Sequence, residues 1–76
     1  STYDLTVYAS DGSIIKETII YHGTPINFVL TNPDDPDFSG YYVSATCPDF
    51  PVNLKSPVLE DVILYELYSA DFLDCT

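Results

Sequence analysis

The side chains with the clearest chemical potential in this sequence are its carboxylates. Twelve Asp and Glu residues stand against two basic residues, Lys16 and Lys55, and the formal charge is −10. The densest acidic stretch is the loop at residues 32–40, Asn-Pro-Asp-Asp-Pro-Asp-Phe-Ser-Gly. Asp35, Asp37 and Ser39 in this loop follow the spacing of the first half of a calcium-binding loop, which places oxygen ligands at alternate positions.

The calcium pattern is incomplete, because Thr46 stands where such a loop needs a bidentate Glu. The alternative is an Asp-rich turn whose carboxylates accept hydrogen bonds from nearby backbone N–H groups. The sequence favours this ordinary turn. Calcium bound by Asp35, Asp37 and Ser39 is kept as a second hypothesis, and no other cofactor is expected.

Motifs for bond-making chemistry are missing from the chain. The three glycines are isolated, so no phosphate-binding loop, dinucleotide motif or nucleophile elbow is present. His22 is the only histidine, and the sequence places no Ser, Cys or carboxylate beside it; a turn residue is the expected role. With so many carboxylates, some lie close together by chance, so they do not identify an acid–base pair. We therefore predict that the protein is not an enzyme.

Cys47 and Cys75 are the only cysteines, and their spacing matches neither a zinc nor a redox motif. A disulfide between them would close a loop of about 28 residues and stabilise the fold by roughly 3 kcal/mol. Such a bond suits an oxidising compartment, whereas a cytosolic protein would keep two free thiols. The compartment stays open, with an extracellular or virion-associated setting favoured over the cytoplasm.

The strong negative charge restricts the possible partners. It opposes direct binding to nucleic acid and to anionic membranes, and no run of about 18 apolar residues could span a bilayer. A protein with a basic surface is the partner that this charge would attract. High net charge also serves solubility alone, which is the competing explanation.

The chain is short enough for one domain over residues 1–76. Residues 3–9 alternate apolar and mostly polar side chains, as a half-buried strand does. Asp11-Gly12 then predicts a type I′ hairpin turn, with residues 13–21 returning antiparallel. The Ile-Ile pairs in the returning strand break the alternation, which indicates a bulge, a twist or burial on both faces.

Two further strands are expected, over residues 26–31 and 41–46. One face of the second would carry Tyr41, Val43, Ala45 and Cys47, and the other would carry Tyr42, Ser44 and Thr46. Residues 47–57, called the arm below, contain three prolines and cannot form a regular element. We expect the arm to lie extended across the sheet, anchored by Phe50, Val52 and Leu54.

The C-terminal segment, residues 58–73, has two interpretations. Ser56 before Pro57, with acidic residues following, resembles a helix start. The apolar residues, however, would surround a helix almost completely, and β-branched and aromatic types are frequent, so a strand is favoured. The predicted fold is mainly β, a small antiparallel sandwich or partly open barrel that starts with a hairpin; the alternative is an α+β fold with one C-terminal helix.

Aromatic content gives the main indication of function. Seven Tyr and four Phe offer rigid amphipathic contacts of the kind enriched in protein interfaces. Tyr8, Tyr42 and one of Tyr65 or Tyr68 are predicted to face outward and contact another protein. Packing within the sheet is an equally good explanation of these tyrosines.

The predicted function is a non-enzymatic protein-interaction module, an accessory or structural subunit that docks on a virion, filament or surface layer. Its open sheet edges could pair with a partner strand or with a second copy of the chain. Two alternatives remain. One is an acidic inhibitor or immunity-type protein that mimics nucleic-acid charge, and the other is a calcium-stabilised extracellular module.

Overall fold

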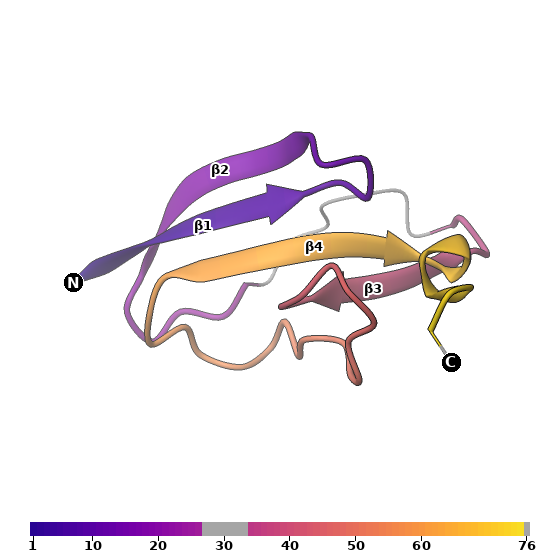
Figure 1. The fold of residues 1–76 in the computed structure, drawn as a ribbon. Helices are drawn as coiled ribbons and strands as arrows, with labels where there is room; N and C mark the ends of the chain where they lie inside the picture. The colour runs from indigo at the N-terminus through magenta and orange to yellow at the C-terminus, as the bar shows by residue number, and fades with distance from the viewer. Residues whose placement is uncertain (27–33, 76) are drawn as a thin grey trace.

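The computed structural model describes residues 1–26 and 34–75, and it is built on one four-stranded sheet (Figure 1). The strands are β1 (Thr2–Tyr8), β2 (Ile14–Tyr21), β3 (Phe38–Tyr42) and β4 (Val62–Tyr68), and a short 3₁₀ helix, η1 (Ser69–Phe72), follows the last strand. The strand order is β2-β1-β4-β3. The prediction of a mainly β fold is confirmed.

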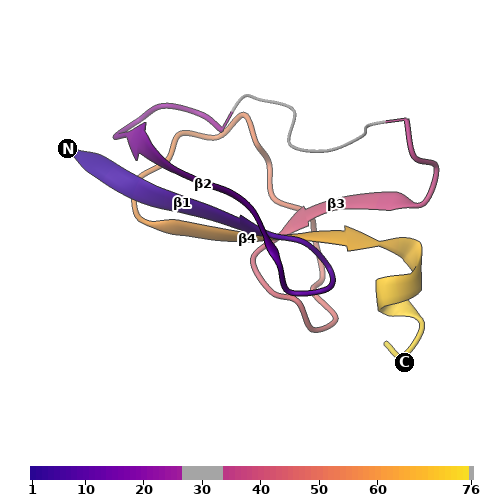
Figure 2. The same ribbon diagram turned by 90° about the horizontal axis from the view of Figure 1, so that it is seen from above.

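The sheet is mixed and open, whereas the sequence predicted an antiparallel arrangement. β1 pairs antiparallel with β2, and β3 pairs antiparallel with β4, but β1 and β4 are parallel. Parallel neighbours need a long crossover connection. Here the chain between Tyr21 and Val62 supplies it, and part of that connection passes over one side of the sheet (Figure 2).

The predicted hairpin is confirmed, although its turn differs from type I′. Within this turn, Gly12 alone has a positive φ, of 92°. The Gly12 N–H donates to the Ala9 carbonyl, and the Ala9 N–H donates to the Ser13 carbonyl. This is the pattern of a three-residue loop that ends in a glycine bulge. A second irregularity leaves Ile15 as the extra residue of β2, since Val7 pairs with Lys16 and Tyr8 pairs with Ile14. Of the three alternatives that the Ile-Ile pairs indicated, the bulge is present at the first pair.

The main cluster of buried hydrophobic residues lies on one side of the sheet, called the core face here. Leu5, Val7 and Leu64 on the two central strands are fully buried. Val7 and Leu64 are direct neighbours in the parallel register. Four residues complete the buried cluster from the outer strands and the connections: Ile20, Ile26, Tyr41 and Val58. The two central strands therefore supply the most completely buried side chains.

The arm covers the core face, as predicted, and no strand forms within it apart from an isolated bridge between Pro57 and Pro25. Val52 and Leu54 pack against the core as expected anchors. Phe50 was wrongly predicted as an anchor, because its side chain is 81 % exposed. Phe50 lies in a series of bends that follows Cys47. The arm first bonds the sheet after Phe50, where the Val52 N–H donates to the Tyr41 carbonyl.

The strand predicted over residues 41–46 begins earlier and ends at Tyr42. Local hydrogen bonding explains the early end, because the Ser44 hydroxyl accepts a bond from the Thr46 N–H and bends the chain. The predicted placement of Val43 and Cys47 on a strand face is therefore wrong. Gly40 has a φ of 134°, and a Cβ there would lie 3.2 Å from the Pro51 Cβ, so this position of β3 favours glycine.

The C-terminal segment forms strand β4 and the short helix η1, so the favoured strand interpretation is confirmed. A disulfide joins Cys47 to Cys75 across a separation of 28 residues and ties the start of the arm to the chain after η1. The strand expected over residues 26–31 lies, except for Ile26, outside the described residues.

Replacing both cysteines by serine should lower the free energy of unfolding by about 3 kcal/mol, because the disulfide restricts a loop of 28 residues in the unfolded chain. Denaturant titration of the wild type and of the Cys47→Ser, Cys75→Ser variant measures this difference. Wild type kept in reducing agent should match the variant. Equal stability of the oxidised wild type and the variant would contradict the prediction.

Adjacent residues of β4 should respond very differently to truncation. Leu64 is fully buried, so Leu64→Ala should destabilise the fold by about 3–5 kcal/mol. Ile63 is 51 % exposed on the opposite side of the same strand, and Ile63→Ala should cost less than about 1 kcal/mol. Thermal and denaturant unfolding of the two variants tests the orientation of β4, and a larger loss for Ile63→Ala would show that the orientation is reversed.

Candidate functional site

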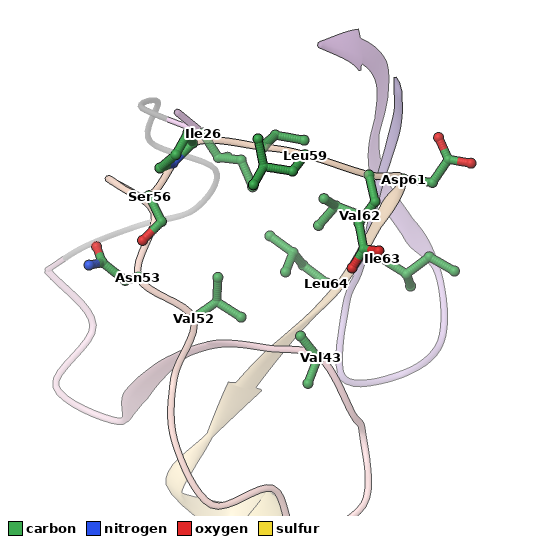
Figure 3. A pocket seen from close by; sticks show the side chains of 13 residues that line it. Ile26, Val43, Val52, Asn53, Ser56, Leu59, Asp61, Val62, Ile63 and Leu64 are labelled. Atoms are coloured by element: carbon green, nitrogen blue, oxygen red, sulfur yellow. The ribbon is translucent and has the colours of Figure 1, made fainter. Parts of the chain in front are cut away.

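A hollow of about 700 Å³ lies beside the first half of β4 (Figure 3). The figure shows β4 on one side of it and residues of the arm on the other. Its walls are mainly aliphatic. Six of the lining side chains carry most of this character: Ile26, Val43, Val52, Leu59, Ile63 and Leu64.

The hollow exists because β3 and β4 overlap over only part of their length. Tyr42, the last residue of β3, pairs with Tyr65, so β3 does not reach residues 62–64 of β4. On the opposite wall, the Val58 N–H donates to the Thr24 carbonyl and fixes the end of the connection. Between these fixed points the chain turns at Asn53, whose carbonyl accepts a bond from the Ser56 N–H.

The hollow combines exposed apolar side chains with carboxylates. Val43, Leu59 and Ile63 are 69 %, 60 % and 51 % exposed, which is unusual for aliphatic residues gathered around one cavity. Glu60 and Asp61 belong to the same lining and are exposed. Nothing in this set resembles a nucleophile with its base. The arrangement is suited to holding an apolar group next to a positive charge.

The side of the sheet opposite the core face, called the open face here, continues this apolar surface. Ile63 lies beside Thr6 on β1, and one row further Tyr65 stacks on Tyr8, with ring centroids 5.5 Å apart and planes 19° apart. Ile14 on β2 is the cross-strand partner of Tyr8, and its side chain is 54 % exposed. Tyr8 and Tyr65, two of the predicted contact residues, are therefore brought together on a partly exposed surface.

Tyr42 was wrongly predicted to face outward. Its side chain is only 6 % exposed and packs edge-on against Phe72 of η1, with ring centroids 5.5 Å apart. Its hydroxyl donates to the Ser39 carbonyl at 3.2 Å. The cause is η1, which follows β4 directly and folds over this end of the sheet, a feature that the alternation within β3 alone does not reveal.

Tyr68 is half-buried, and its hydroxyl donates to Oε1 of Glu66 at 2.6 Å. Glu66 is a buried carboxylate, 5 % exposed, and its Oε2 has no hydrogen-bond partner among the described residues. The bond to Glu66, burial and the nearby negative charge together raise the pKa of Tyr68 to about 12. This pair was not predicted from the sequence, although a carboxylate at a strand position between Leu64 and Tyr68, on the same face, was a signal for it.

In the acidic loop, Asp35 makes a local turn contact, and the backbone of Asp37 bonds a distant part of the chain. Oδ1 of Asp35 accepts a bond from the Asp37 N–H at 2.9 Å, and the Asp37 carbonyl accepts one from the Ser69 N–H at 2.8 Å. Ser39 is exposed on β3. Over residues 1–26 and 34–75, no group of three or more His, Cys, Asp or Glu side chains is arranged to hold a metal ion. The calcium hypothesis therefore stays a prediction from sequence spacing.

His22 lies in the turn after β2, and its Nδ1 is 2.8 Å from the Tyr3 hydroxyl.

Comparison with known proteins finds no matching family model and no significantly similar curated protein. In the part of the chain that the structure describes, no helix has the length and apolar character needed to cross a bilayer.

The Glu66–Tyr68 bond should make stability depend on alkaline pH. The pKa of Tyr68 rises from 10.0 to about 12 on folding, so its contribution is fully present below pH 10 and is lost as the pH rises through about 12. The difference in unfolding free energy between wild type and Tyr68→Phe should be constant below pH 10 and shrink above it. Denaturant titrations at a series of pH values measure this.

Tyr21→Phe is the matched control for this titration, because Tyr21 is 71 % exposed at the end of β2. Its difference from wild type should not reproduce the change that Tyr68→Phe shows between pH 10 and about 12. A Tyr68→Phe difference that is flat over this range would show that the Glu66–Tyr68 bond does not affect the phenol.

Proposed function

We propose that this protein is a non-enzymatic docking module that binds another protein with a basic surface. In this role it would serve as a small accessory or structural subunit of a larger assembly, such as a virion, a filament or a surface layer. The observation that carries the proposal is the gathering of exposed Val43, Leu59 and Ile63 beside two exposed carboxylates. Contiguous exposed apolar surface with a polar rim is typical of protein interaction sites.

The open face supports the same function. It extends the apolar surface from Ile63 across the stacked Tyr8 and Tyr65 rings to Ile14. Tyrosine pairs of this kind supply large contact area at low cost in conformational entropy. An interface that joins the hollow to this face would have an apolar centre and an acidic rim, which fits the common arrangement of an apolar core within a polar rim.

The net negative charge of this chain predicts that the proposed partner has a basic surface. Apart from Lys16 and Lys55, the chain has only acidic charged side chains, so a basic surface would be attracted over several ångströms and oriented before contact. Apolar contact at the hollow would then hold the complex. We therefore expect that salt slows association, and that loss of apolar side chains speeds dissociation.

The spread of the carboxylates gives less support to mimicry of nucleic acid. Asp61 lies next to Asp4 where β4 begins, whereas Asp71 bonds the Tyr68 N–H where β4 ends. Asp11 lies in the hairpin loop and Asp49 in the arm. Mimicry of a phosphate row needs one continuous acidic face, so docking through apolar surface is the function we propose.

Site-directed photo-cross-linking tests the proposal. A photoreactive amino acid at Ile63, on the rim of the hollow, should cross-link to one protein in an extract of the source organism. The same group at Ser10, exposed in the hairpin loop, should not. The captured protein is then purified, and its affinity for this chain should fall between low and moderate salt. Equal cross-linking from both positions, or none from Ile63, would contradict the proposed function.

A further inference from the structure

The edge segments of the sheet differ in how they are protected among the described residues. β2 carries a bulge at Ile15 and the charged Lys16, both of which oppose pairing with another strand. Beyond β3, the Val52 N–H already donates to the Tyr41 carbonyl. Residues 62–64 of β4 pair with β1 on one side, and no described strand pairs with them on the other.

The unpaired side of residues 62–64 faces the hollow. Val62, Ile63 and Leu64 all belong to its lining, so the space beside this edge is hollowed instead of being filled by the arm. The edge lies in line with β3, whose last residue pairs with Tyr65, the next residue of β4. An extended segment lying in the hollow would therefore continue β3 along β4.

The walls of the hollow fit the alternating side chains of such a segment. Buried Leu64, together with half-buried Val52, offers an apolar floor on the core face. Glu60 and Asp61 stand where the hollow meets the start of β4. Side chains on one side of an added strand would meet aliphatic carbon, and Lys or Arg near its end would meet carboxylates.

A second copy of this chain is a poor occupant. Two copies would bring formal charges of −10 each into contact, and each copy carries only two basic residues. A segment from a basic partner avoids this repulsion and gains from the opposite sign. The net charge therefore favours a segment of a different, basic protein over a second copy of this chain as the occupant of the hollow.

We propose that the hollow is a strand-addition site that binds an extended segment of the partner, with aliphatic residues at alternate positions and Lys or Arg beside them. The segment pairs through its backbone with residues 62–64 of β4 and takes the position of a longer β3. This inference rests on the proposed function and adds the kind of partner segment and the place where it binds.

A displayed library of random linear peptides is the probe. Selection against the oxidised full chain should enrich sequences that alternate aliphatic residues with Lys or Arg and lack Pro at central positions. The best peptide is then synthesised, and its affinity for the wild type and for variants is measured by fluorescence anisotropy.

Two pairs of variants test the position of the peptide. Val43→Lys puts at the hollow a charge that repels the Lys or Arg residues of the peptide and should weaken binding at least about tenfold, whereas Leu73→Lys, at a site 78 % exposed outside the hollow, should change it less than about twofold. Glu60→Gln should reduce both affinity and its salt dependence. The matched Glu17→Gln, exposed on β2, should do neither.

Backbone methylation of the peptide tests strand pairing itself. Methyl groups on one set of alternate amide nitrogens should weaken binding at least about tenfold, because these N–H groups face β4. Methylation of the other set should have little effect. Equal tolerance of both sets would overturn strand addition.

The outcomes separate this inference from the proposed function. Failure to enrich any peptide, enrichment of acidic or Pro-rich peptides, or dimerisation through residues 62–64 would each overturn the strand-addition site. If cross-linking from Ile63 still captured a basic partner, the docking function would stand without it. Failure of both experiments would remove the function as well.

Discussion

The parallel pairing of β1 with β4 is the constraint on which the rest of this structure depends. It places the N-terminal strand beside the C-terminal strand at the centre of the sheet, with Val7 next to Leu64. Both side chains are fully buried. Because parallel strands cannot be joined by a tight turn, the chain between them must cross the sheet, and the arm covers the core face as a result.

That crossing leaves the other side of the sheet and part of an edge without cover. The open face keeps exposed aliphatic and stacked aromatic side chains, and among the described residues η1 folds over one end of it. The offset between β3 and β4 leaves residues 62–64 beside the hollow. The surfaces that suit a partner are therefore consequences of the same pairing that builds the core.

Features governed by neighbouring residues could be predicted from the sequence, and those set by distant contacts could not. Asp11-Gly12 identified the hairpin, and the nearly continuous apolar character around Leu64 identified β4 as a strand. The end of β3 was missed because Ser44 bonds the backbone of Thr46. Tyr42 was misplaced because η1, 30 residues later in the chain, covers it.

The candidate site was the least predictable part. No local pattern encodes parallel pairing between the two ends of the chain, so neither the offset of β3 nor the hollow follows from the sequence. Glu66, buried between Leu64 and Tyr68, similarly needed the fold to reveal its bond to the phenol. The net charge of the chain, by contrast, follows directly from its composition and predicts a positive charge on the surface of the partner.

Nuclear magnetic resonance of the β4 backbone tests the account most directly. The account predicts contacts between backbone protons of Thr6 and Ile63 in the parallel pattern, together with alternating slow and fast amide exchange across residues 62–64. The fast-exchanging amides would be those on the side of the hollow. An antiparallel pattern, or slow exchange at every one of these amides, would contradict an open edge at the start of β4.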